Sequence, residues 1–162
     1  MFRRVLVANR GEIAARILRT CQRLGIETVA VYSDADATAP HVRAATRAVR
    51  LGPAPVRESY LSVDALEQAI RDTGADAVHP GYGLLSENRG FAERVAATGA
   101  RFVGPPPAAL EAFGDKIRAR AVARSVGVQP PPGSDGAVDP GDAAGLREAA
   151  ERVGLPLLVK AA

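Results

Sequence analysis

One pattern of polar and apolar positions recurs five times along the chain: an amphipathic stretch, then a glycine, then a short apolar run. It lies at Leu24-Gly25-Ile26, Thr73-Gly74-Ala75, Thr98-Gly99-Ala100, Val126-Gly127-Val128 and Val153-Gly154-Leu155. A glycine just past a helix can take the left-handed conformation that closes it. Repetition of helix, glycine and strand predicts an α/β fold built on a buried parallel sheet.

The apolar runs and helical periodicities place individual elements. Strands are expected at residues 4–8, 28–33, 48–51, 76–80 and 101–105, and helices at 11–24, 62–73, 88–98, 115–126 and 143–153. Ser62 is suited to cap the helix that follows it. A shorter helix is expected within "GPPPAALEAFGDK".

The composition of the chain changes after about residue 104. Residues 1–104 are expected to form a five-stranded α/β unit, whereas residues 129–142 are a connector rich in Pro, Gly and Asp. The chain then reaches "LPLLVKAA", which is typical of a buried strand. A buried strand at this position predicts a domain that continues beyond residue 162.

Composition excludes several classes of protein. Apolar residues make up 47% of the 162 residues but aromatic residues only 4%, so Leu, Val, Ile and Ala must build the core. The net charge of +3 comes from scattered arginines without a basic, aromatic-rich run, which argues against nucleic-acid binding. The single Cys21 lies on an apolar helical face and is expected to be a buried, inert thiol. Neither a signal-peptide core nor an 18-residue apolar run is present, so we expect a cytosolic protein.

Candidate chemistry gathers at the carboxyl ends of the expected strands, where parallel α/β sheets bind ligands. The loop after the first strand, with Asp34 and Asp36 after the second, is compatible with a dinucleotide site. That loop has a single Gly11, however, where the dinucleotide fingerprint needs three glycines.

The segment "AVHPGYGLLSEN", residues 77–88, follows the fourth strand and carries three functional groups. His79 could be a general base, a metal ligand or, more often for a lone His before Pro, an organiser of the loop. Tyr82 lies between two glycines, which allow a backbone to approach a ligand closely. Glu87 could cap the next helix or contact a ligand. Neither a nucleophile with its partners nor a pair of Cys or His at metal spacing is visible.

Taken together, "VLVANRGEIAARILRTCQRLGIETVAVYSDAD", "LGPAPVRESYL", "HPGYGLLSEN", "FVGPPP" and "GDKIRAR" resemble the amino-terminal part of a biotin carboxylase. Within that family, the motifs most resemble the biotin-carboxylase subunit of a bacterial acetyl- or propionyl-CoA carboxylase. It implies a Rossmann-like pre-ATP-grasp domain at residues 1–112. Residues 113–162 would then be linker helices and the first strand of an incomplete ATP-grasp domain.

The same resemblance implies a reaction. The whole enzyme would use ATP, Mg²⁺ and bicarbonate to carboxylate biotin on a carrier protein, and a carboxyltransferase would use the product. Lys116 and Lys160, the only two lysines, match ATP-binding positions, where a compact ammonium suits phosphate oxygens. Tyr82, Gly83 and, beside them, Glu87 match a wall of the biotin pocket. The resemblance implies no catalytic or metal-binding residue within these 162 residues, so the chain alone is expected to be inactive.

Some positions depart from the resemblance, and some alternatives stay open. Relatives often have acids at the positions of Thr46 and Arg47 and usually Phe at that of Leu84. Arg23 replaces a frequent acid on a helix that contributes to a dimer contact in relatives, which leaves the homodimer open. Another pre-ATP-grasp ligase, an NAD-binding Rossmann module and an interaction domain without catalysis are the alternative functions.

Overall fold

The computed structural model describes residues 1–134 and 136–160. In order, the elements are β1 (Arg4–Val7), α1 (Gly11–Arg23), β2 (Glu27–Ser33), the 3-10 turn η1 (Asp34–Asp36), α2 (Pro40–Ala44), β3 (Arg47–Gly52), η2 (Val56–Glu58), α3 (Val63–Thr73), β4 (Ala77–His79), α4 (Arg89–Ala97), β5 (Arg101–Phe102), α5 (Pro107–Gly114), α6 (Lys116–Ser125) and α7 (Ala143–Val153). They divide into two compact units, Met1–Leu110 and Glu111–Ala162.

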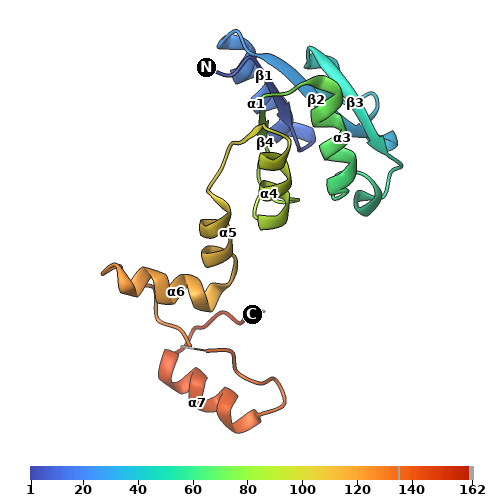
Figure 1. Ribbon diagram of the computed structural model, residues 1–162. Coiled ribbons are helices and arrows are strands. Elements are labelled where there is room, and N and C mark those ends of the chain that lie inside the picture. Colours follow the sequence, from blue (N-terminus) through green and yellow to red (C-terminus); the bar gives the residue numbers. More distant parts are fainter. Residues whose placement is uncertain (135, 161–162) are drawn as a thin grey trace. The chain divides into compact units, whose positions relative to one another are not determined.

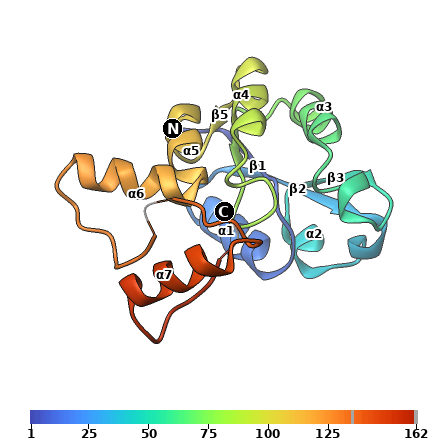
Figure 2. The ribbon, with the colours of Figure 1, turned by 90° about the horizontal axis from the view of Figure 1, so that it is seen from below.

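The first unit is a three-layer α/β structure around one parallel sheet. The strand order is β3-β2-β1-β4-β5, and every neighbouring pair is parallel. Helices α1 and α2 cover one face of this sheet, and α3 and α4 cover the other (Figures 1 and 2). The α/β fold and five-stranded parallel sheet expected from the sequence are thus confirmed.

Alternation along β1 divides the core into two apolar layers. Val5 and Val7 pack with α1 residues such as Leu18, whereas Leu6 packs in the opposite layer with residues of α3 and α4 such as Phe91. All five side chains are at most 3% exposed. A strand buried on both faces needs apolar side chains at successive positions, which explains the continuous apolar run of β1.

The glycines of the recurring pattern all follow helices and have positive φ, although Gly154, with ψ 160°, is not in the left-handed conformation. Gly25, Gly74, Gly99, Gly127 and Gly154 all have positive φ, between 60° and 86°. Gly74, for example, closes α3 in the left-handed conformation, while the Ser62 side chain accepts a hydrogen bond from the Ala65 N–H at its start. Cys21 is a buried free thiol, as expected, and desolvation raises its pKa.

Three short elements were not expected from the sequence, and one expected strand does not form. The missed elements are η1, α2 and η2, each of five residues or fewer, which are too short to produce a periodic pattern. The expected strand at residues 157–160 does not form among the described residues, where Leu158 and Val159 are exposed. A strand needs a hydrogen-bonded neighbour, and no described segment pairs with this run. Residues 161 and 162, also expected in that strand, lie outside the described residues.

The second unit consists mainly of the two helices α6 and α7, each with an acidic N-cap. Asp115 accepts a hydrogen bond from the Arg118 N–H at 2.8 Å, and Asp142 accepts from the Ala144 and Gly145 N–H groups. These helices confirm the two expected at 115–126 and 143–153. None of the helices in the described part of the chain is long and apolar enough to span a membrane.

Candidate functional site

The loop after β4 has an unusual backbone that the sequence explains. Gly81 and Gly83 have φ angles of +66° and +62°, on either side of Tyr82, and Leu84 follows at +45°. Glycine takes this left-handed conformation at no steric cost, whereas Leu84 must be held in it by its partly buried packing against the α3/α4 layer. The loop is therefore a defined turn at the carboxyl edge of the sheet.

His79, the last residue of β4, organises this turn. Its Nδ1 accepts a hydrogen bond from the Gly81 N–H at 3.0 Å, so Nδ1 is unprotonated and any ring proton lies on Nε2. Burial lowers the pKa of the imidazole. This hydrogen bond supports the role of loop organiser for His79, and the described residues contain no cluster of three metal-ligating side chains.

Asn9, which the sequence analysis did not single out, joins the loop after β1 to the loop after β4. Its Nδ2 donates to the Pro80 carbonyl at 2.7 Å and to the Tyr82 carbonyl at 2.8 Å, and its Oδ1 accepts from the Arg10 N–H at 2.9 Å. The side chain is only 4% exposed. The adjacency of β1 and β4 in the sheet brings these two loops together.

Tyr82 presents its ring to solvent beside the start of α1. The residue is 61% exposed, and its hydroxyl donates a hydrogen bond to Glu12 in the first turn of α1. This contact with a carboxylate raises the pKa of the phenol. An exposed aromatic ring flanked by glycines, held at its hydroxyl, offers a flat apolar surface at the edge where α/β folds bind ligands.

Glu87 does not cap the helix that follows. Asn88 is the N-cap of α4, and its Oδ1 accepts from the Phe91 N–H at 2.8 Å, while Glu87 lies exposed one position earlier. Of the two roles left open for Glu87, that of helix cap is therefore excluded. The preference of Asn for N-cap positions was the signal that would have excluded it.

Asp34 and Asp36 are engaged in contacts with the protein itself. Arg50 donates to both oxygens of Asp34, at 2.7 and 2.8 Å, which lowers the pKa of that carboxyl. Asp36 accepts from the Tyr60 hydroxyl at 2.6 Å; mainly through burial, and with help from this bond, the pKa of Tyr60 rises to about 12. With both carboxylates so occupied, the dinucleotide interpretation of this edge loses its ribose partner.

The two lysines lie in the second unit. Lys116 is the first residue of α6, and Lys160 follows α7; both side chains are exposed. Neither ammonium group makes an ion pair within the described residues. Tyr82, Gly83 and Glu87 belong to the first unit, so the five predicted site residues divide between the two units.

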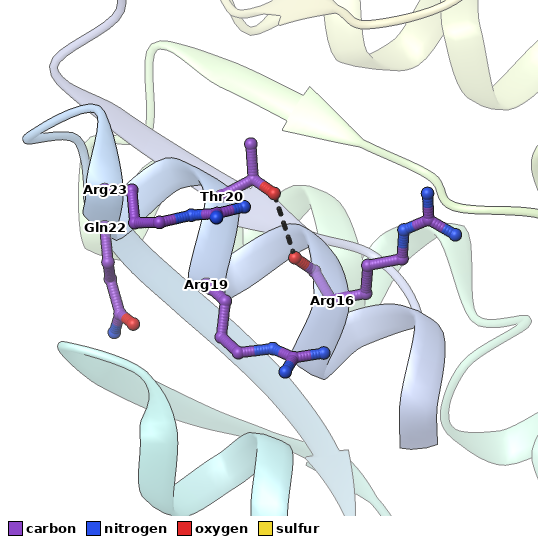
Figure 3. A pocket seen from close by; sticks show the side chains of 5 residues that line it. All are labelled: Arg16, Arg19, Thr20, Gln22 and Arg23. Atoms are coloured by element: carbon purple, nitrogen blue, oxygen red, sulfur yellow. Dashed lines mark hydrogen bonds between the residues drawn. The ribbon is translucent and has the colours of Figure 1, made fainter.

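A shallow hollow of about 700 Å³ lies over the outer face of α1 (Figure 3). It is lined by Arg16, Arg19, Thr20, Gln22 and Arg23. The Thr20 hydroxyl donates a hydrogen bond to the Arg16 carbonyl at 3.3 Å, and Gln22 Nε2 donates one to the Ala44 carbonyl at 2.5 Å. The lining residues of the hollow include no acid, and the hydroxyl of Thr20 is already hydrogen-bonded to the Arg16 carbonyl.

The two histidines are expected to lower the free energy of unfolding in weak acid. Desolvation lowers the folded-state pKa of His41 and His79 below the ordinary value of 6.5, so the unfolded chain binds protons first. The free energy of unfolding should therefore be highest above pH 6.5 and should fall as the pH decreases below that value. Urea unfolding between pH 7.5 and pH 5 measures this slope. His41→Gln should flatten it, and a slope that is unchanged in this variant would contradict the assignment to His41.

Comparison with known proteins gives one family. The sequence model of the family described as "Biotin carboxylase, N-terminal domain" matches residues 1–110. The propionyl-CoA carboxylase alpha chain of Ruegeria pomeroyi is 49% identical over 161 residues, which are 99% of this chain and 23% of that protein. The biotin carboxylase of Haemophilus influenzae is also 49% identical over 161 residues, 36% of its length. The chain thus spans about a quarter to a third of the curated relatives it matches.

Solved structures agree with the sequence relatives. A structure described as the biotin carboxylase domain of thermophilic 2-oxoglutarate carboxylase bound to bicarbonate has a TM-score of 0.83 at 43% identity, covering 99% of this chain and 36% of that one. A dimer of that domain from Hydrogenobacter thermophilus, in complex with MgADP, ADP and bicarbonate, has a TM-score of 0.85 at 42% identity, covering 96% and 34%.

Proposed function

We propose that this chain, which belongs to the biotin carboxylase family through its domain at residues 1–110, forms the amino-terminal part of an ATP-dependent biotin carboxylase. The whole protein would carboxylate biotin on a carrier protein with bicarbonate and ATP. The carboxylated carrier would then serve the carboxyltransferase of an acyl-CoA carboxylase, a role supported by the propionyl-CoA and methylcrotonoyl-CoA carboxylase chains among the relatives.

The observation that carries the proposal is the turn after β4. It presents Tyr82 and Gly83 at the ligand-binding edge of a sheet, and Tyr82 is exposed to 61% although it is aromatic. We propose that these two residues form one wall of the biotin pocket and that Glu87, exposed on the same loop, lies beside them. Aromatic rings with a polar end suit a fused apolar ring system that carries a ureido group.

For ATP, we propose Lys116 and Lys160 as the phosphate contacts. Both ammonium groups are exposed and make no ion pair within the described residues, so neither must break a contact to bind a phosphate. Their physical role would be neutralisation of phosphate charge. Magnesium would accompany the nucleotide, but the described residues contain no group of three ligating side chains to hold it. Because the resemblance places the catalytic and metal-binding residues outside these 162 residues, we propose that the isolated chain has no carboxylase activity.

The proposal is tested by bicarbonate-dependent ATP hydrolysis, with and without free biotin, in the full-length protein. Lys160→Met should reduce biotin-stimulated hydrolysis roughly tenfold or more, because contacts between charged groups contribute about 1.5–3 kcal/mol and about 1.4 kcal/mol is a factor of ten. Arg101→Met is the control, because Arg101 is an exposed cation at the amino end of β5, away from the carboxyl ends of the strands where the proposed ligand site lies. Hydrolysis that is indifferent to biotin would instead favour another ligase with this fold.

A further inference from the structure

We propose that Asn9 and Glu12 are positioning residues for the wall formed by Tyr82 and Gly83. Asn9 would fix the backbone of the turn, and Glu12 would fix where the Tyr82 ring lies. This inference rests on the proposed function, because it assigns to two residues outside the turn a part in biotin binding.

Asn9 directs both of its N–H donors and its side-chain oxygen to the backbone of two loops. Both of its amide contacts, at 2.7 and 2.8 Å, go to the carbonyl oxygens on either side of Gly81, and its oxygen accepts from the Arg10 N–H. These bonds set the orientation of the Pro80–Gly81 and Tyr82–Gly83 peptides, which lie before and after the Gly81–Tyr82 step of the turn. A buried amide whose nitrogen and oxygen are both hydrogen-bonded to backbone is suited to hold the turn rather than to contact a ligand.

The space around Gly81 shows how closely Asn9 fits. A Cβ added to Gly81 would lie 2.7 Å from Asn9 Nδ2, well inside ordinary contact distance, whereas a Cβ on Gly83 would meet nothing within 4 Å. The Asn9 side chain therefore fills the inner side of the turn. The outer side, at Gly83, is open, which is the side from which a ligand could approach.

Glu12 restrains the position of the Tyr82 ring. Tyr82 is 61% exposed, so packing alone restrains its side chain weakly, and the hydroxyl contact to Glu12 is a restraint supplied by another element. Glu12 lies in the first turn of α1, two residues after the Arg10 N–H that binds Asn9. One short segment, residues 9–12, thus holds both the backbone and the side chain of the proposed wall.

The first test is Asn9→Asp in the full-length protein, with KM measured separately for free biotin and for ATP. Aspartate keeps the shape and the acceptor for Arg10 but replaces both donors with an oxygen facing two carbonyl oxygens. We expect the KM for biotin to rise about tenfold or more while the KM for ATP stays within about twofold. Gln68→Glu makes the same amide-to-carboxylate change on the exposed surface of α3 and should alter neither value.

The second test concerns an exposed pair, so that it does not depend on whether the first variant folds. Glu12→Ala and Tyr82→Phe should each raise the KM for biotin about threefold, and the double variant should be no worse than either. Glu12→Gln keeps an acceptor for the hydroxyl and should restore the normal KM. Additive effects in the double variant would overturn the role of Glu12.

Tyr82→Ala separates the inference from the function on which it rests. If Tyr82→Ala leaves the KM for biotin unchanged, the biotin wall itself is wrong. If Tyr82→Ala raises that KM while folded Asn9→Asp does not, the wall stands and the role of Asn9 is overturned. Parallel increases in the KM for biotin and for ATP in Asn9→Asp would likewise overturn it, because they indicate general disruption of the fold.

Discussion

Replacing Phe91 with alanine is expected to lower the free energy of unfolding by about 3–5 kcal/mol, the range for removal of a buried aromatic ring. Phe91 is 1% exposed at the start of α4, in the layer between the sheet and helices α3 and α4. Its ring meets that of Phe102 edge to face, with centroids 6.0 Å apart. A core built largely from Leu, Val, Ile and Ala has few large side chains that could move into the cavity.

Urea unfolding of the 162-residue chain measures this loss, and Phe113→Ala is the matched control. Phe113 is 60% exposed, so the same substitution there should change the free energy of unfolding by only about 0.5 kcal/mol or less. Equal losses in the two variants would contradict the placement of Phe91 in the core.

Gly81→Ala is expected to destabilise the chain by about 2–5 kcal/mol. Two costs add: the left-handed conformation at φ +66°, about 1–2 kcal/mol for a residue with a Cβ, and a clash with Asn9, about 1–3 kcal/mol for overpacking a filled site. Asn9 cannot move aside without losing its bonds to the two neighbouring carbonyls.

Gly83→Ala separates the two costs. Gly83 has nearly the same φ, +62°, but an added Cβ would meet nothing within 4 Å. This variant should therefore lose only the conformational part, about 1–2 kcal/mol. If both variants lose the same free energy of unfolding in urea, Asn9 does not occupy the inner side of the turn.

Local signals in the sequence were sufficient for the architecture. The five glycines of the recurring pattern follow five helices, α1, α3, α4, α6 and α7, that periodicity had predicted, and the runs after Gly25, Gly74 and Gly99 became parallel strands. The expected strand after Gly154 did not form, because a strand depends on a partner as well as on its own residues.

The site was only partly predictable for a related reason. Tyr82 and Gly83 could be singled out from the local pattern of an aromatic residue between two glycines. Asn9 and Glu12, in contrast, contact the same turn across about 70 positions of sequence. Contacts at that separation leave no periodic trace. Tyr60 likewise reaches Asp36 from a different strand connection, so the true partner of Asp36 could not be inferred from the residues around it.

The position of β1 at the centre of the sheet also has a consequence for synthesis on the ribosome. Val5 pairs with Thr28 on one side and with Ala77 on the other, so the two partners are made at different times. Translation at about 5–20 residues per second separates their emergence by roughly 2–10 s. For that interval β1, with its run of Val5, Leu6 and Val7, exposes an unpaired edge of the kind that recruits other chains into aggregates. The yield of folded protein in a cell should therefore depend on protection of this edge, by a chaperone or by translation speed, until β4 arrives.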